Sequence, residues 1–152
     1  MKVAEALILR ADYQKRLEQL RQRLLRNAKV QEGNAPGEEP QHLLAELEQV
    51  AADLAILIQR INATNAATQL EGGQTIAAAI AERDLLRLRA AVYREMAQAA
   101  TVTQDRYTKS EVKFKSTVDI AAVQQRADDL ARQHRELDTR IQAANWQFDL
   151  RE

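Results

Sequence analysis

The sequence has no residue that forms disulfides and few residues that interrupt helices. Its 152 residues include no cysteine, four glycines and two prolines. The absence of cysteine excludes disulfides, thiol catalysis and cysteine-ligated metals. The scarcity of glycine and proline, beside abundant Ala, Leu, Gln, Glu and Arg, predicts an all-α protein of long helices.

Long apolar runs and an excess of charge of one sign are also missing. The longest uninterrupted apolar run, Ile76–Ala81, falls far short of the roughly 20 residues of a transmembrane helix. Basic and acidic residues number 22 each, which argues against a dedicated binder of nucleic acid or of anionic membranes. The N-terminal residues show no secretion signal. We therefore expect a cytoplasmic protein with no nucleic-acid partner and no membrane partner.

Four segments carry a stripe of residues in alternating steps of three and four, the spacing of packed helices and coiled-coil seams. The stripes predict helices over about Lys2–Val30, Gln41–Asn65 and Ile76–Ala100, and a fourth that is capped by Ser116 or Thr117 and runs to about Phe148. In chain order the stripes are Val3, Ala6, Arg10, Tyr13, Leu17, Leu20 and Leu24; Leu43, Leu47, Val50, Leu54, Leu57 and Ile61; Ile76, Ala79, Ile80, Leu86, Ala90, Tyr93 and Ala97; Ile120, Val123, Ala127, Leu130, His134, Leu137, Ile141, Ala144 and Phe148.

The breaks between these segments have their own signals. Gln31–Pro40 contains two glycines and both prolines, and a second break covers Thr101–Thr117. Glu71–Gly73 is typical of a turn, and Thr75 can cap the third helix. Two short extended pieces are expected, one at Thr68–Leu70 and one at Val112–Lys115, where apolar and basic residues alternate.

The second helix and the fourth helix end on similar sequences. Leu57–Asn65 reads LIQRINATN, and Leu137–Asn145 reads LDTRIQAAN, 80 positions later. The same offset carries the first stripe onto the third. One interpretation is a duplicated helical hairpin, and the other is four ordinary helices of similar composition. Both predict one domain over 1–152, an up-down-up-down bundle of hairpins at about 2–65 and 75–148, with at most one or two very short strands.

Two surface features suggest partners. Nine large apolar residues lie off the stripes, which favours a wide core or a subunit interface and hence a homo-oligomer. These residues are Ile8, Leu9, Leu25, Leu44, Ile56, Ile58, Leu85, Leu88 and Val92. The first helix also carries seven basic residues from Arg10 to Lys29, which either bind a polyanion or face the acids that follow between Glu32 and Asp53.

Residues with the spacing of a catalytic or metal site are sparse. Glu39 and His42 have the spacing of one half of a di-iron site, but no second motif exists. His134 lies on the fourth stripe, where a partly buried histidine and a catalytic base are both conceivable. We predict no catalytic, cofactor or metal site. The one repeated polar set is Arg60, Asn65, Arg140 and Asn145, which at a common pole could hold an anion, contact a subunit, or simply end the helices.

Five stretches of the sequence resemble a known family. They are Met1–Leu17, Arg23–Gly33, Arg60–Asn65 (RINATN), Arg106–Phe114 and Leu137–Trp146 (LDTRIQAANW). Together they resemble the septicolysin-like family of small bacterial helical proteins, over nearly the whole chain. The resemblance implies a helical protein without known catalytic residues, and its name implies a cytolysin.

Three classes of function follow. The sequence favours a non-catalytic structural or interaction protein that acts as a homo-oligomer. A membrane-active protein is implied by the family name alone, and the sequence has no cysteine for thiol activation and no apolar hairpin to insert. A small-anion or nucleotide binder would use the pole at Arg60 and Arg140.

Overall fold

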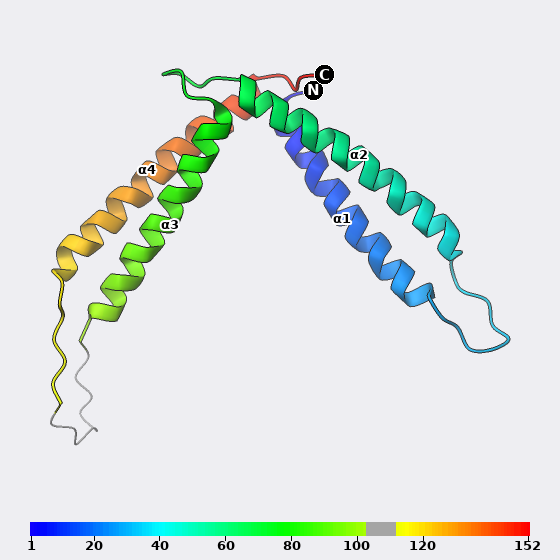
Figure 1. The fold of residues 1–152 in the computed structure, drawn as a ribbon, viewed down its shortest axis with the longest axis horizontal. Coiled ribbons are helices and arrows are strands. Elements are labelled where there is room, and N and C mark those ends of the chain that lie inside the picture. The colour runs from blue at the N-terminus through cyan, green and yellow to red at the C-terminus, as the bar shows by residue number, and fades with distance from the viewer. Residues whose placement is uncertain (103–111) are drawn as a thin grey trace. The chain divides into compact units, whose positions relative to one another are not determined.

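The computed structural model describes residues 1–102 and 112–152, and the described residues form four long helices without a sheet (Figure 1). The helices are α1 (Val3–Asn27), α2 (Pro40–Ala67), α3 (Ile76–Ala100) and α4 (Ile120–Gln147). The predicted all-α fold is confirmed, and every stripe residue is buried or half-buried. The middle of the predicted break at Thr101–Thr117 lies outside the described residues.

The chain divides into two compact units. The first comprises Met1–Thr75 with Gln142–Glu152, and the second comprises Ile76–Ile141. The first therefore holds α1, α2 and the last turns of α4, and the second holds α3 and most of α4. Within each unit the two long helices run antiparallel, as the up-down-up-down order requires (Figure 1).

The connection between α1 and α2 is fixed by polar contacts at the turn end of the hairpin. Proline at the first position of α2 lacks the N–H that a helix start leaves unpaired, and its ring presets the helical φ. The Asn27 side chain accepts a hydrogen bond from Glu38 N at 3.0 Å. Arg23 and Glu38 form an ion pair in which Arg23 Nε lies 3.0 Å from Glu38 Oε2. The Arg23 hydrogen bond lowers the pKa of Glu38.

At the other end of the first unit, the two chain termini pair with each other. Lys2 and Asp149 form an isolated antiparallel bridge. Val3 N donates to Phe148 O at 3.1 Å, and Leu150 N donates to Met1 O at 2.8 Å. Lys2 Nζ also lies 3.0 Å from an Asp149 carboxylate oxygen. The C-terminal residues therefore close the hairpin of α1 and α2.

A small core lies beneath this closure. Buried Ala6, Leu57, Ile61 and Leu150 form one cluster, and partly buried Leu7, Leu9 and Tyr13 pack against it. Leu150 is 7% exposed although it belongs to no helix. The last residues of the chain thus contribute to the core of a hairpin that begins at the first residues.

A tight turn follows α2. Gln69 and Thr75 form an isolated antiparallel bridge, so the extended piece predicted at Thr68–Leu70 is confirmed as one bridge. Leu70 N donates to Gln74 O at 2.8 Å across the turn. Gly72 and Gly73 have φ of 99° and 86°, which residues with a Cβ rarely adopt.

The cap of α4 predicted at Ser116 or Thr117 is wrong. Asp119 caps α4, because its carboxylate accepts a hydrogen bond from Ala122 N at 3.2 Å. Ser116 instead makes a local turn, in which its hydroxyl accepts from Val118 N at 3.2 Å. The strand predicted at Val112–Lys115 is also wrong, since no strand is assigned to these residues in the described part of the chain and Phe114 is 79% exposed.

An arginine links the two helices of this hairpin. Arg83 on α3 donates to Asp84 at 3.0 Å and to Asp138 on α4 at 2.9 Å. Burial acts to lower the pKa of Arg83, but the hydrogen bonds to the two carboxylates outweigh it and raise that pKa. The contact positions α3 against α4 on one side of the pair.

The helix bounds refine the offset of 80. Helix α4 begins and ends 80 positions after α2, whereas α3 begins and ends 73 positions after α1. The connection from α3 to α4 is seven residues longer than the connection from α1 to α2. The two offsets, 73 and 80, differ by seven residues, which is one heptad or two helical turns. Both offsets therefore place the buried stripe of α1 on the buried stripe of α3.

Candidate functional site

An exposed row of apolar residues runs along α3. Leu85, Leu88, Val92 and Met96 are 58%, 58%, 54% and 46% exposed. Exposed Ala78, Ala81 and Ala99 extend the row in both directions. We call these seven exposed residues the α3 stripe, as distinct from the buried stripe on another face of the same helix. At 3.6 residues per turn it lies roughly 130° around the helix from buried Leu86, Ala90 and Ala97. Helix α3 therefore has two apolar faces, and only one of them is buried.

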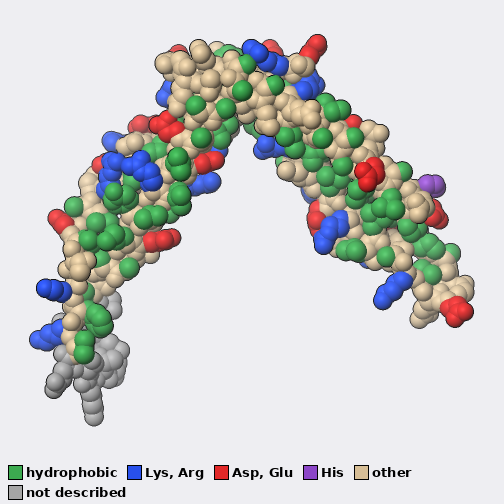
Figure 2. All heavy atoms as spheres, in the orientation of Figure 1, with side chains coloured by type: hydrophobic (Ala, Val, Ile, Leu, Met, Phe, Trp, Pro, Cys, Tyr) green, Lys and Arg blue, Asp and Glu red, His purple; other side chains and the backbone are tan. Residues whose placement is uncertain are grey.

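The large exposed apolar residues of α1 and α2 do not form such a row. Ile8 and Leu25 on α1 lie roughly 100° apart around that helix, and Leu44 and Ile56 on α2 lie roughly 120° apart. Each is at least 42% exposed. Figure 2 shows such green side chains scattered over the surface. Of the nine residues predicted off the stripes, seven are exposed, whereas Leu9 and Ile58 are half-buried.

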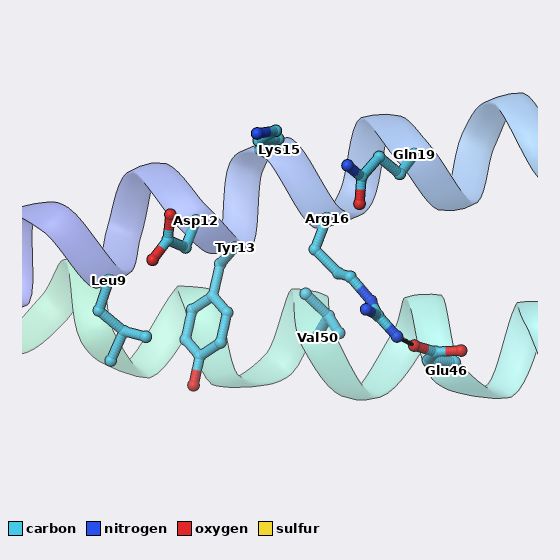
Figure 3. A pocket seen from close by; sticks show the side chains of 8 residues that line it. All are labelled: Leu9, Asp12, Tyr13, Lys15, Arg16, Gln19, Glu46 and Val50. Carbon is cyan, nitrogen blue, oxygen red and sulfur yellow. Dashed lines mark hydrogen bonds and ion pairs between the residues drawn. The ribbon is translucent and has the colours of Figure 1, made fainter.

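A shallow groove lies between α1 and α2 (Figure 3). Its volume is about 520 Å³, and Leu9, Tyr13, Arg16, Glu46 and Val50 are among the residues that line it. Arg16 reaches across the groove and pairs with Glu46. Together with the Arg23–Glu38 pair, this contact shows that two of the seven basic residues of the strip pair with acids of the following segment.

The predicted polar cluster is distributed over both units. Arg60 and Asn65 on α2 and Asn145 on α4 belong to the first unit, and Arg140 belongs to the second. Arg60 Nε donates to Arg151 O at 2.8 Å. Asn145 is 4% exposed, and Asn65 Oδ1 is buried without a hydrogen-bond partner among the described residues. That these four residues form one anion site stays a prediction.

The asparagines do not end their helices, because α2 continues to Ala67 and α4 to Gln147. Sequence reasoning also missed Thr64, which is fully buried. Its hydroxyl donates to Arg60 O at 2.7 Å and accepts from Arg151 N at 3.0 Å. The available signal was the difference between Thr64 and Ala144 at matching positions of the two echoed sequences. A hydroxyl in only one copy indicates a contact made by only one hairpin.

The histidines do not form a metal centre. His42 is exposed in the first turn of α2, and Glu39 is the residue that precedes that helix. His134 is half-buried on α4. Within 1–102 and 112–152, no group of three or more His, Asp or Glu side chains is placed to hold a metal ion.

Comparison with known proteins identifies the family. A model of a family of unknown function, DUF6847, matches residues 10–150. The chain belongs to this family. A crystal structure of a functionally unknown conserved protein from Corynebacterium diphtheriae is 42% identical, covers 99% of each chain and superposes with a TM-score of 0.94. No curated protein matches the chain.

These findings correct the expected resemblance. Nothing in the comparisons supports a septicolysin-like label, because the matching family and the similar structure are both of unknown function. None of the helices in the described part of the chain is both long enough and apolar enough to cross a membrane. The cytolysin interpretation rested on the label alone and loses its support with it.

Proposed function

We propose that the protein is a non-catalytic interaction protein that acts as a homodimer, paired through the α3 stripe. The observation that carries this proposal is the second apolar face of α3, which lies roughly 130° around the helix from the buried face. Four large side chains, each about half exposed, form a continuous row at helical spacing. Such rows on a protein surface favour contact with another helix.

The spacing of the stripe favours a second copy of the same chain. Three pairs of its residues are centred on the point midway between residues 88 and 89. These pairs are Ala81 and Met96, Leu85 and Val92, and Ala78 and Ala99. An antiparallel pair with a two-fold axis at this point sets each of these residues opposite its mate. The row is thus self-complementary, as an isologous interface requires.

The energetics point the same way. Burying the exposed half of a large apolar side chain gives about 1 kcal/mol. Four such side chains on each of two copies give about 8 kcal/mol, whereas a partner with no apolar row leaves only about 4 kcal/mol. Association itself costs at least about 4 kcal/mol in lost freedom of motion. Pairing with a second copy therefore leaves a favourable net free energy of binding, whereas binding to an unrelated polar surface does not.

Light scattering behind size exclusion tests the dimer. The chain has a mass of 17.2 kDa. A margin of about 4 kcal/mol corresponds to a Kd of about 1 mM, so the wild type is expected to approach twice that mass at millimolar concentration. Leu85→Glu sets a carboxylate opposite Val92 of the partner subunit and is expected to give the monomer. Leu85 is 58% exposed, so the helix itself tolerates the change, as circular dichroism would verify.

Ile56→Glu is the matched control, because Ile56 is 57% exposed and lies on α2. This variant should remain dimeric. A wild type that elutes as a monomer, or an equal loss of dimer in the two variants, would refute the proposed surface.

A further inference from the structure

A second concave surface lies on the hairpin of α3 and α4, away from the α3 stripe. Its volume is about 190 Å³. The residues that line it are Arg87, Ala90, Ala91, Arg94, Ala131, His134 and Arg135. Arg87 and Arg94 are seven residues apart and therefore share one side of α3, roughly 160° around the helix from the centre of the stripe. The concave surface is thus independent of the proposed dimer contact.

The lining carries three guanidinium groups and no carboxylate. Neither Arg94 nor Arg135 forms an ion pair with any residue in the described ranges. Arg87 approaches Asp84 only to 4.0 Å, and Asp84 is already held by Arg83 at 3.0 Å. Figure 2 shows basic side chains gathered on this hairpin. The site therefore has excess positive charge although the chain as a whole is neutral.

The floor of the site explains why it is hollow. Ala90, Ala91 and Ala131 leave space between α3 and α4 that larger residues would fill. A volume of 190 Å³ corresponds to about six water molecules at roughly 30 Å³ each. This is room for one tetrahedral oxyanion with a few waters, and it is below the roughly 300 Å³ at which pockets for larger ligands begin.

The chemistry of the lining selects among anions. Each guanidinium presents a planar fork of donors that matches two oxygens of a phosphate group. Half-buried His134 adds an imidazole that donates at least one N–H bond when one nitrogen is protonated. Charge-assisted hydrogen bonds of this kind are the stronger class of polar contact.

We infer that Arg87, Arg94, Arg135 and His134 form a binding site for a phosphate dianion, either free or as the terminal group of a small phosphomonoester. The site differs in place from the predicted pole at Arg60 and Arg140. It gives the α3–α4 hairpin a ligand function in addition to the proposed pairing.

Calorimetric titration of the full-length chain tests the site. The probes are inorganic phosphate, sulfate and phenyl phosphate, with the ionic strength held constant by sodium chloride. We expect saturable binding of phosphate by the wild type. Removing two charge-assisted contacts in R94Q/R135Q should raise the Kd by at least about tenfold. The order of affinity for inorganic phosphate and phenyl phosphate distinguishes the free anion from a phosphomonoester.

R126Q/R132Q is the matched control, since it removes two exposed arginines of α4 that lie outside the site. Its Kd for phosphate should equal that of the wild type, and both variants should keep wild-type helicity. The inference is overturned by a wild type that shows no saturable binding of either phosphate probe. It is equally overturned if the two double variants weaken binding to the same degree, because binding would then reflect overall charge.

Discussion

Replacing Leu150 by alanine should destabilise the hairpin of α1 and α2 far more than a change at a chain end usually does. Leu150 is 7% exposed and packs with Ala6, Leu57 and Ile61. Its backbone N–H donates to Met1 O, so the residue is held in place while its side chain is removed. The substitution leaves a cavity that the short terminal segment can only partly close.

The expected cost can be estimated from this burial. Leu→Ala changes in protein cores cost about 2–5 kcal/mol, and a segment near the surface belongs to the lower part of that range. We therefore expect a loss of about 2–3 kcal/mol in the free energy of unfolding. For a chain of this size, each kcal/mol corresponds to roughly 2–4 °C, so the Tm should fall by about 5–10 °C.

Urea and thermal unfolding followed by far-UV circular dichroism measure the change. Leu25→Ala is the control, because Leu25 is 61% exposed on α1 and its truncation should stay within about 0.5 kcal/mol. If Leu150→Ala and Leu25→Ala shift the unfolding midpoint equally, the C-terminal residues do not close the hairpin as described.

Two further predictions concern the connections. Glu38→Gln should lower the urea midpoint at neutral pH. The lowered pKa of Glu38 stabilises the fold above the usual carboxyl value of 4.5, and that contribution is lost as the pH falls below it. A difference between Glu38→Gln and wild type that is independent of pH would contradict the ion pair with Arg23. Gly73→Ala should lower the free energy of unfolding by about 1–2 kcal/mol, because its φ of 86° is unfavourable for a residue with a Cβ. No other atom lies within 4 Å of the new Cβ, so a steric clash adds nothing to this cost. Gly37→Ala, which has only an ordinary contact of 3.6 Å with Asn27, should cost less, and an equal cost for the two would contradict the role of φ.

Much of the helical structure could be predicted because a helix that packs on one side repeats its apolar residues locally. The bounds of α3 agree with prediction at both Ile76 and Ala100. The end of α2 was harder to predict, because Asn65 favours a helix end locally while the helix continues for two more residues.

The closure of the first hairpin could not be predicted from local patterns. Lys2 pairs with Asp149, and the residues after Gln147 are too few to show a period. Leu150 therefore gave no signal of burial. The echoed sequences also concealed a contact, since Thr64 bonds to the terminal segment and Ala144 has no hydroxyl to do so.

The two proposed surfaces also differed in whether the sequence could predict them. Leu85, Leu88 and Val92 stood out as apolar residues off the buried stripe, so their exposure was predictable. The basic site was not predicted, because Arg135 joins Arg87 and Arg94 only when α3 and α4 pack side by side. The seven-residue spacing of the two α3 arginines was the local signal available.

Disulfide trapping tests the antiparallel pairing of α3 most directly. The chain has no cysteine, so Ala81→Cys and Met96→Cys each introduce a single thiol. In the proposed pair, residue 81 of one copy faces residue 96 of the other, while identical residues lie about 22 Å apart along the helix at about 1.5 Å per residue. That distance is far beyond the roughly 7 Å limit between Cα atoms for a disulfide. Oxidation is expected to link the two variants when they are mixed and to link neither variant to itself. Linkage of either variant to itself, or no linkage in the mixture, would contradict this pairing.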